Sequence, residues 1–310
     1  MTSTARLLVS DEPDDKIGQE ILGKLDHVSI VTYDPNQSAL SITQQSAAIF
    51  LPPYRGSHRP IPLVRQISNL KMVQLLSAGT DEYASHVPSH VVLASARGAH
   101  AGPVSEWVLS AILAQFRQWP TLVRYQDQNT WAHRKFHADT LAGKRALIVG
   151  AGAIGTAVAG LLNAFGAQST LVASKARNGV SAASDLPTLI RGHQVVVITA
   201  PLTDETRGLV GPDFLAAMDD GALLVNAGRG AIVDTNALVA ELRKERLRAA
   251  LDVTDPEPLP PDHPLWNVPG VIISPHSART VPGTNALCYS VAAEQITAFL
   301  AGERPSNAAR

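Results

Sequence analysis

Short apolar runs alternate with helix-like segments along the chain and form two series. The first series predicts five strands, rich in β-branched residues, at 7–9, 28–31, 47–51, 72–76 and 91–93. Segments with helical periodicity lie between these runs, for example at 16–25 and 61–70. This alternation predicts a small βαβ domain.

The second series predicts six strands, at 146–149, 170–172, 195–199, 222–225, 249–253 and 271–274. These runs are continuously apolar, as expected for a doubly wound parallel sheet that helices cover on both faces. Between the two series, apolar residues recur at helical spacing over 103–118, with Pro103 in the first turn. We expect this helix to span the junction of two α/β domains.

Length and charge narrow the class of protein. A chain of 310 residues with 45% hydrophobic residues suits two globular domains. Its net charge of −1 gives no general attraction to nucleic acid or to an anionic membrane. The apolar runs are too short to span a bilayer, and the N-terminal segment lacks the apolar core of a secretory signal, so a cytoplasmic location is expected. Cys288 is the single cysteine, and its apolar neighbours predict a buried structural thiol.

A glycine pattern follows the first strand of the second series. Gly150, Gly152 and Gly155 stand between that strand and an alanine-rich helical stretch at 153–165. Gly150 would permit a tight turn, Gly152 would let a pyrophosphate approach the backbone, and Gly155 would allow close helix–strand packing. The same pattern also occurs in ordinary turns, but its position after a strand and before a helix favours dinucleotide binding.

About 20 residues after such glycines, NAD-binding folds place an acidic residue on the adenosine ribose. Here the segment from Leu171 to Asn178 contains no carboxylate, and it offers Ser174, Lys175 and Arg177 instead. These side chains could bind a 2′-phosphate, which predicts a preference for NADP(H), with NAD(H) possible. The alternative is that they are solvated loop cations.

Three later segments, together with the glycines, resemble the D-2-hydroxyacid dehydrogenase family. They are Asn226-Ala-Gly-Arg229, then Leu-Asp252-Val with the following Asp-Pro-Glu257-Pro, and finally Ser-Pro-His276. The resemblance runs from about residue 72 to 292. It implies a Rossmann-type dinucleotide domain at 99–284 and a smaller flavodoxin-like substrate domain formed by 1–98 and 285–310.

The resemblance implies a role for each of these side chains. Arg229 would hold the substrate carboxylate, and His276, oriented by Glu257, would donate a proton to the carbonyl oxygen. Asp252 would hold the nicotinamide carboxamide. The alternatives are an arginine in an exposed turn and a strand-end aspartate that caps a turn.

The resemblance also implies further contacts. Ala153, Ile154, Pro201 and Ala227 would lie at the cofactor. Ala78 and Gly79, in a loop that could otherwise be a plain strand-to-helix turn, would bind the substrate carboxylate through backbone N–H groups. Three residues are candidates for the substrate side with undecided roles, namely Tyr54, Arg55 and Arg279, and the last of these departs from the small residue usual at its position.

The implied activity is the NADPH-dependent reduction of a 2-keto acid to a D-2-hydroxy acid, with glyoxylate, hydroxypyruvate or an aryl-pyruvate as substrate. One alternative is an NAD-linked phosphoglycerate dehydrogenase. Another is a dinucleotide-sensing regulator like the CtBP-type corepressors, because fold and site are shared.

Two remaining features concern partners and metals. The segment 125–140 carries large apolar groups where the family builds its two-fold interface, so a homodimer is expected. His133 and His137 have the spacing of metal ligands on a helix, but no third ligand is apparent and no metal is expected.

Overall fold

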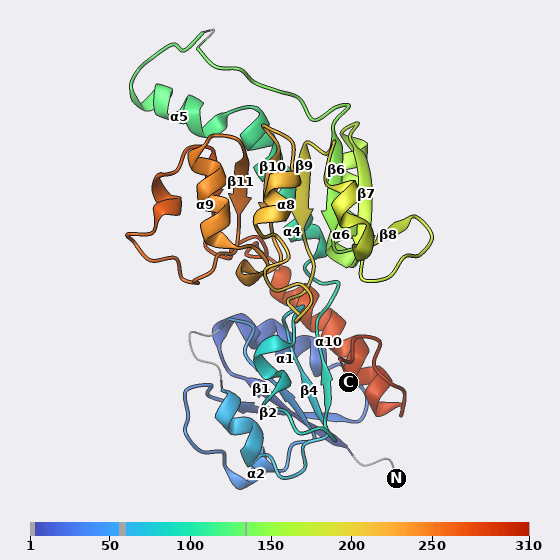
Figure 1. The fold of residues 1–310 in the computed structure, drawn as a ribbon. Coiled ribbons are helices and arrows are strands. Elements are labelled where there is room, and N and C mark those ends of the chain that lie inside the picture. Colours follow the sequence, from blue (N-terminus) through green and yellow to red (C-terminus); the bar gives the residue numbers. More distant parts are fainter. Residues whose placement is uncertain (1–3, 56–59, 134, 310) are drawn as a thin grey trace. The chain divides into compact units, whose positions relative to one another are not determined.

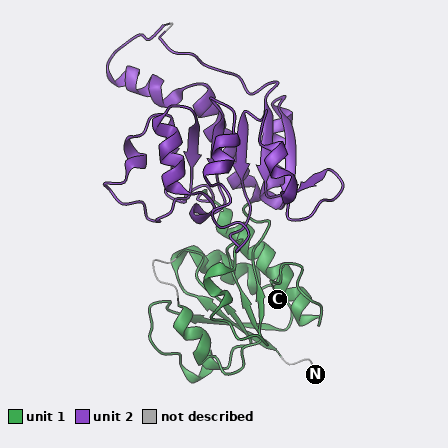
Figure 2. Ribbon diagram, viewed as in Figure 1, with its two compact units in different colours: residues 1–100, 281–310 green, residues 101–280 purple. Residues whose placement is uncertain are grey.

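The chain divides into two compact units (Figure 2). The computed structural model describes residues 4–55, 60–133 and 135–309. Unit 1 consists of Met1–His100 with Val281–Arg310, and unit 2 consists of Ala101–Thr280. Two segments discussed above are described only in part. Residues 1–3 of the N-terminal segment and Arg134 of the predicted interface at 125–140 lie outside the described residues.

Unit 1 is built on a parallel sheet with the strand order β2-β1-β3-β4-β5 (Figure 1). This is the flavodoxin-like order, which confirms the predicted fold of the smaller domain. The first two α-helices, α1 and α2, are Lys16–Leu22 and Ile42–Gln45, and α3 is Asp81–Ala84. The strands β1 to β5 are Ala5–Ser10, Val28–Tyr33, Ile49–Leu51, Met72–Gln74 and Val92–Ala94.

The C-terminal helix α10 (Thr284–Leu300) packs against α1 in unit 1. Cys288 on this helix is fully buried, as predicted, and its Sγ lies 3.2 Å from Nε2 of His100. The predicted helix at 61–70 is instead a 3-10 helix over Ile61–Gln66, and it stops at Ile67, whose backbone is extended.

Unit 2 contains a parallel sheet with the order β12-β11-β10-β9-β6-β7-β8 (Figure 1). Its strands β6 to β12 are Arg145–Val149, Gln168–Ala173, Val180–Ala182, Val195–Ile198, Leu223–Asn226, Arg248–Leu251 and Val271–Ile273. Its helices α4 to α9 are Ala101–Phe116, Trp119–Asp127, Ala153–Ala164, Leu186–Leu189, Pro212–Ala217 and Thr235–Arg243. The predicted doubly wound sheet is confirmed, whereas the edge strand β8 was not predicted.

Successive residues of the unit 2 strands enter two different cores. Leu147 and Val149 pack with α8 and α9, while Ala146 and Ile148 pack with α4 and α6. All four side chains are at most 4% exposed. Both faces are therefore covered, which explains why the strands are apolar without alternation. Within the described chain, no helix is long and apolar enough to cross a membrane.

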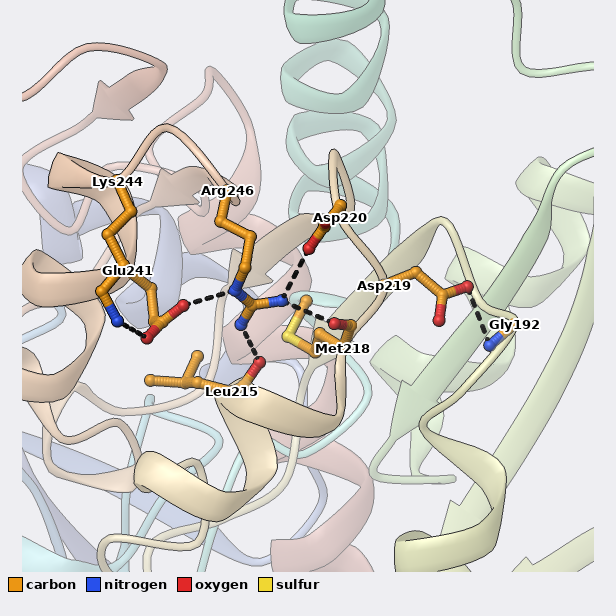
Figure 3. Close-up of polar contacts among 8 residues, drawn as sticks. All are labelled: Gly192, Leu215, Met218, Asp219, Asp220, Glu241, Lys244 and Arg246. Atoms are coloured by element: carbon orange, nitrogen blue, oxygen red, sulfur yellow. Dashed lines mark hydrogen bonds and ion pairs between the residues drawn. The ribbon is translucent and has the colours of Figure 1, made fainter.

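At the edge where the unit 2 strands begin, Arg246 joins three segments (Figure 3). Its Nε donates to Glu241 Oε2 at 2.5 Å, and Nη1 donates to the carbonyl of Met218 at 2.7 Å. The carbonyl of Leu215 accepts from Nη2. The guanidinium thus binds two carbonyl groups at the end of α8 and fixes the start of β11.

A buried carboxylate holds two loops of unit 1 together. The strand order reverses between β1 and β3, and Asp15, after β1, accepts a hydrogen bond at Oδ1 from the backbone N–H of Tyr54, after β3 (2.9 Å). The hydroxyl of Tyr289 on α10 donates to the same oxygen at 2.9 Å. Burial raises the pKa of Asp15, and the hydrogen bond from Tyr54 opposes this shift. Asp15 therefore fixes the loop that carries Tyr54 and Arg55.

We expect Asp15 to make stability depend on pH. Because its pKa is higher in the folded protein, the folded state binds more protons, and the free energy of unfolding falls as pH rises from about 4 through the raised pKa. Asp15→Asn should remove this decline in denaturant titrations. Asp14→Asn, at a half-exposed neighbour, should retain it. Equal slopes in the wild type and in Asp15→Asn would contradict the expectation.

Candidate functional site

The glycine turn of unit 2 follows β6, where the strand order reverses between β6 and β9. Gly150 has a φ of 118°, and a side chain there would place Cβ 2.5 Å from the amide nitrogen of Ala200. A Cβ on Gly155 would overlap the carbonyl oxygen of Gly150. Both positions therefore need glycine, one for its conformation and one for the close approach of α6 to the strand.

The start of α6 can accept an anion. Gly152 is its N-cap and offers no side chain to the first N–H groups of the helix, and no atom lies within 4 Å of where its Cβ would stand. Ala153 is exposed and Ile154 is half-buried at this first turn. Open backbone and the positive end of the helix dipole are what a pyrophosphate needs, so these residues fit a dinucleotide.

The loop after β7 brings a cation to this turn. Arg177 donates from Nη2 to the carbonyl of Ala151 at 2.6 Å, so its guanidinium lies beside the glycine turn. Ser174 and Lys175, also predicted at the cofactor, are exposed in the same loop. Pro201 follows β9 and Ala227 follows β10, at the same carboxyl edge of the sheet.

Arg229 stands in a turn after β10 that a buried asparagine shapes. Asn226 donates from Nδ2 to the carbonyl of Arg229 at 3.0 Å and accepts at Oδ1 from the N–H of Gly228 at 3.1 Å. The guanidinium of Arg229 donates to the carbonyl of Gly228 at 2.8 Å. Sequence reasoning gave Asn226 no role, although its place between an apolar strand and Ala-Gly-Arg was the available signal.

His276 and Glu257 form a hydrogen-bonded pair at the same edge of the sheet. Nδ1 of His276 lies 2.6 Å from Oε1 of Glu257, and the two side chains are 40% and 42% exposed. Nε2 is the other ring nitrogen and faces away from this contact by the geometry of imidazole. A carboxylate beside Nδ1 keeps a proton on that nitrogen, so a ring protonated on both nitrogens can give the proton of Nε2 to a substrate oxygen and return to the neutral Nδ1–H tautomer.

Asp252 is 4% exposed and lies directly after β11. Its carboxylate accepts hydrogen bonds from the loop after β12, including the hydroxyl of Ser274 at 2.5 Å and the N–H of Ser277 at 2.8 Å. Arg279, half-buried, comes at the end of this loop. The structure thus brings Asp252 together with the segment that carries His276.

The predicted substrate residues of unit 1 lie in two loops. Ala78 and Gly79 follow β4, and their N–H groups meet no acceptor in the part of the chain that the structure describes. Tyr54 is 5% exposed, and the guanidinium of Arg55 lies over its ring, 5.6 Å from the centroid. Arg55 also approaches the carboxylate of Asp14 at 4.0 Å.

The described residues contain no group of three side chains that could hold a metal ion. His133 and His137 lie in an irregular stretch after α5, so the helical spacing suggested by sequence does not occur there. They provide no reason to place a metal in the site.

The chain is similar in sequence to known proteins. A family model described as D-isomer specific 2-hydroxyacid dehydrogenase, NAD binding domain, matches residues 109–278. A glyoxylate reductase of Aeropyrum pernix is 35% identical over 264 residues, which cover 79% of this chain and 78% of that protein.

Two solved structures have similar folds. The first, a D-isomer specific 2-hydroxyacid dehydrogenase family protein of Aeromonas salmonicida, has a TM-score of 0.86 and 28% identity, covering 99% of both chains. The second is a D-isomer specific 2-hydroxyacid dehydrogenase of Xanthobacter autotrophicus in complex with NADPH and MES. It has a TM-score of 0.82 and 28% identity, covering 99% of this chain and 98% of that one.

A substitution at Gly155 tests the close packing of the glycine turn. Gly155→Ala should lower the free energy of unfolding by about 1–3 kcal/mol, because its Cβ would overlap the Gly150 carbonyl. Gly160→Ala in the same helix meets no atom within 4 Å and should be neutral or stabilising. Chemical denaturation measures both, and equal stability of the two variants would contradict the packing argument.

Proposed function

Because the chain belongs to the D-isomer specific 2-hydroxyacid dehydrogenase family, we propose that it reduces a 2-keto acid to a D-2-hydroxy acid with NADPH. The coarser activity, that of an NAD(P)-dependent 2-hydroxyacid dehydrogenase, follows from membership of the family. The contact of 2.6 Å between His276 and Glu257, at the carboxyl edge of the sheet that carries the glycine turn, is the observation that supports the finer proposal.

Each residue then has one task in reduction. When bound, the nicotinamide cofactor supplies a hydride for C2 of the keto acid. Arg229 binds the substrate carboxylate with its planar fork, and His276 donates the proton of Nε2 to the carbonyl oxygen. Glu257 keeps the imidazole oriented and stabilises its protonated form. Asp252 stays a candidate for contact with the nicotinamide carboxamide.

We propose a small 2-keto acid such as glyoxylate or hydroxypyruvate as substrate, with an aryl-pyruvate as the next candidate. The similarity to a protein named glyoxylate reductase supports the smaller substrate. In unit 1, the N–H groups of Ala78 and Gly79 are proposed to bind the carboxylate, and Tyr54 and Arg55 to contact the rest of the substrate. Arg279 is proposed to bind a further polar group of the substrate.

The proposed cofactor is NADPH, bound by Gly150, Gly152 and Gly155 with Ala153, Ile154, Pro201 and Ala227. Ser174, Lys175 and Arg177 would contact the 2′-phosphate. The position of Arg177 beside the glycine turn supports this choice, as does the NADPH complex of the similar Xanthobacter protein. An NAD-linked phosphoglycerate dehydrogenase is the second candidate, and a cytoplasmic location stays a prediction.

Oxidation of NADPH and NADH by the purified protein, followed over a panel of 2-keto acids, tests the proposal. Turnover with glyoxylate or hydroxypyruvate and NADPH is expected. Phosphohydroxypyruvate with NADH as the best pair would favour the second candidate. Tight cofactor binding without turnover of any keto acid would favour a dinucleotide-sensing regulator.

His276→Ala should lower kcat for keto acid reduction roughly 10²-fold or more and leave NADPH binding nearly intact, because only proton donation is lost. Glu257→Gln should lower kcat less than His276→Ala does, because the imidazole keeps its place in the site and loses only the carboxylate that orients it. His90→Ala, at an exposed histidine of unit 1, is the control. A kcat unchanged in Glu257→Gln would exclude Glu257 from the mechanism.

Replacing both Lys175 and Arg177 with alanine should weaken NADPH binding by about 1–3 kcal/mol and barely change NADH binding, since only NADPH carries the 2′-phosphate. Raised salt should reduce the wild-type preference, because the loop is exposed. Arg191→Ala removes an exposed cation elsewhere in unit 2 and should change neither NADPH binding nor NADH binding. A wild-type kcat/KM with NADH equal to that with NADPH would refute the cofactor assignment.

We propose that α5 and the stretch after it form a homodimer interface. Trp131 is 88% exposed, Trp119 57% and Val123 47%, which is more apolar surface than one short segment of a monomer usually shows. A dimer is expected in sedimentation velocity at micromolar concentration. Trp119→Ser with Trp131→Ser should give monomers, whereas Trp266→Ser, at a similarly exposed tryptophan, should not. A wild-type monomer would refute the interface.

A further inference from the structure

Four donors from the loop after β12 converge on Asp252. The hydroxyl of Ser274 donates to Oδ1 at 2.5 Å, and the N–H of Ser277 donates to the same oxygen at 2.8 Å. The N–H of Ala278 reaches both carboxylate oxygens, at 3.0 and 3.1 Å. The backbone N–H of His276 donates to the carbonyl of Asp252 at 2.7 Å. Asp252 thus accepts hydrogen bonds from four groups of the segment that carries His276.

The backbone of His276 needs such support. Its φ is 52°, in the left-handed region that residues with a side chain rarely adopt. This conformation turns the imidazole toward Glu257, at a distance of 2.6 Å. Without the contacts to Asp252, the loop would lose the hydrogen bonds that oppose relaxation of this strained residue. The imidazole–carboxylate geometry therefore depends on the loop, and the loop depends on Asp252.

The sheet explains why these residues meet. Leu251 and Ile273 are register partners in the neighbouring strands β11 and β12, so Asp252 and Ser274 leave the sheet side by side. Asp252 is only 4% exposed. A buried carboxylate must be satisfied by donors, and hydrogen bonds to an ionised acceptor are short and strong. The hydroxyl of Ser274 is the one side-chain donor among those described at this carboxylate.

We propose that Asp252 and Ser274 are positioning residues that hold His276 in the conformation in which its ring pairs with Glu257. The proposal rests on the proposed function, in which this pair donates the proton. It gives the carboxylate of Asp252 a task within the protein, distinct from the cofactor contact that the family resemblance implies. It also assigns a task to the hydroxyl of Ser274, a residue that sequence reasoning did not single out.

Kinetics on the full-length protein provide the first test. Ser274→Ala should lower kcat for keto acid reduction about 10-fold, because a loosened loop misplaces the proton donor. Asp252→Asn should lower it further. Ser274→Thr retains a hydroxyl and should restore most of the rate. Ser277→Ala removes a neighbouring hydroxyl for which the described residues show no hydrogen bond, and it should stay within about twofold of the wild type.

A double-mutant cycle separates positioning from general loss of structure. If Ser274 acts through the hydrogen-bonded pair, Ser274→Ala should cost much less in kcat when Glu257→Gln is already present. The dissociation constant of NADPH, measured by fluorescence titration, should remain within about twofold in Ser274→Ala, because cofactor affinity does not depend on the ring of His276. Additive effects in the cycle would overturn the proposal.

A readout without turnover keeps the proposal separate from the proposed function. In protein with isotope-labelled histidine, NMR at one pH can follow the ring signals of His276, assigned by their absence in His276→Ala. In Ser274→Ala and in Asp252→Asn, these signals should move or broaden, as in Glu257→Gln, because the ring loses its fixed place beside the carboxylate, and in Ser277→Ala they should not. If the wild type reduces no keto acid but its variants show these changes, the proposed function is wrong and the positioning role stands.

A different outcome would assign the carboxylate of Asp252 to the cofactor. If Asp252→Asn weakens NADPH binding more than about 10-fold while the ring signals of His276 stay as in the wild type, the carboxylate serves the cofactor and the positioning role is wrong. Unchanged ring signals of His276 in Ser274→Ala would remove Ser274 from the proposal by themselves.

Discussion

Both sheets are parallel and covered on both faces, and this constraint decides where chemistry can occur. Most side chains between the covering helices are apolar, so most polar groups lie where strands begin or end. In unit 2, the glycine turn, Arg229, Asp252 and His276 all follow strands at the carboxyl edge. The cluster around Arg246 occupies the other edge and ties segments together there (Figure 3).

The loops at the carboxyl edges are held by one recurring arrangement, in which a buried or half-buried polar side chain after one strand binds the backbone of another loop. Asp15 holds Tyr54 in unit 1, and Asp252 holds the loop after β12 in unit 2. The side chain of Thr199, after β9, donates to the carbonyl of Gly150 at 2.8 Å. Such contacts replace the helix and strand hydrogen bonds that a loop lacks, which keeps its position defined without burying it.

The sequence was sufficient for the two sheets because continuous apolar strands and glycine turns are local signals. It missed β8 (Val180–Ala182), a short edge strand of mixed polarity that lacks an apolar run. It also identified His276 and Glu257, through their resemblance to known motifs, but not the left-handed backbone of His276. That conformation depends on hydrogen bonds to Asp252, 24 positions earlier in the chain, and no local pattern encodes such a contact.

Charge at the carboxyl edge of unit 2 shows how a chain with a net charge of −1 can attract anions. Three acidic groups at this edge are held by donors of their own loops: Asp234 caps α9, Asp252 accepts from the loop after β12, and Glu257 pairs with His276. Arg177 hydrogen-bonds a neutral carbonyl beside the glycine turn, so among the described contacts no carboxylate offsets its charge there. This cation and the open N-terminus of α6 lie on the same turn, and together they give the proposed anionic cofactor a local positive site that the net charge of the chain does not provide.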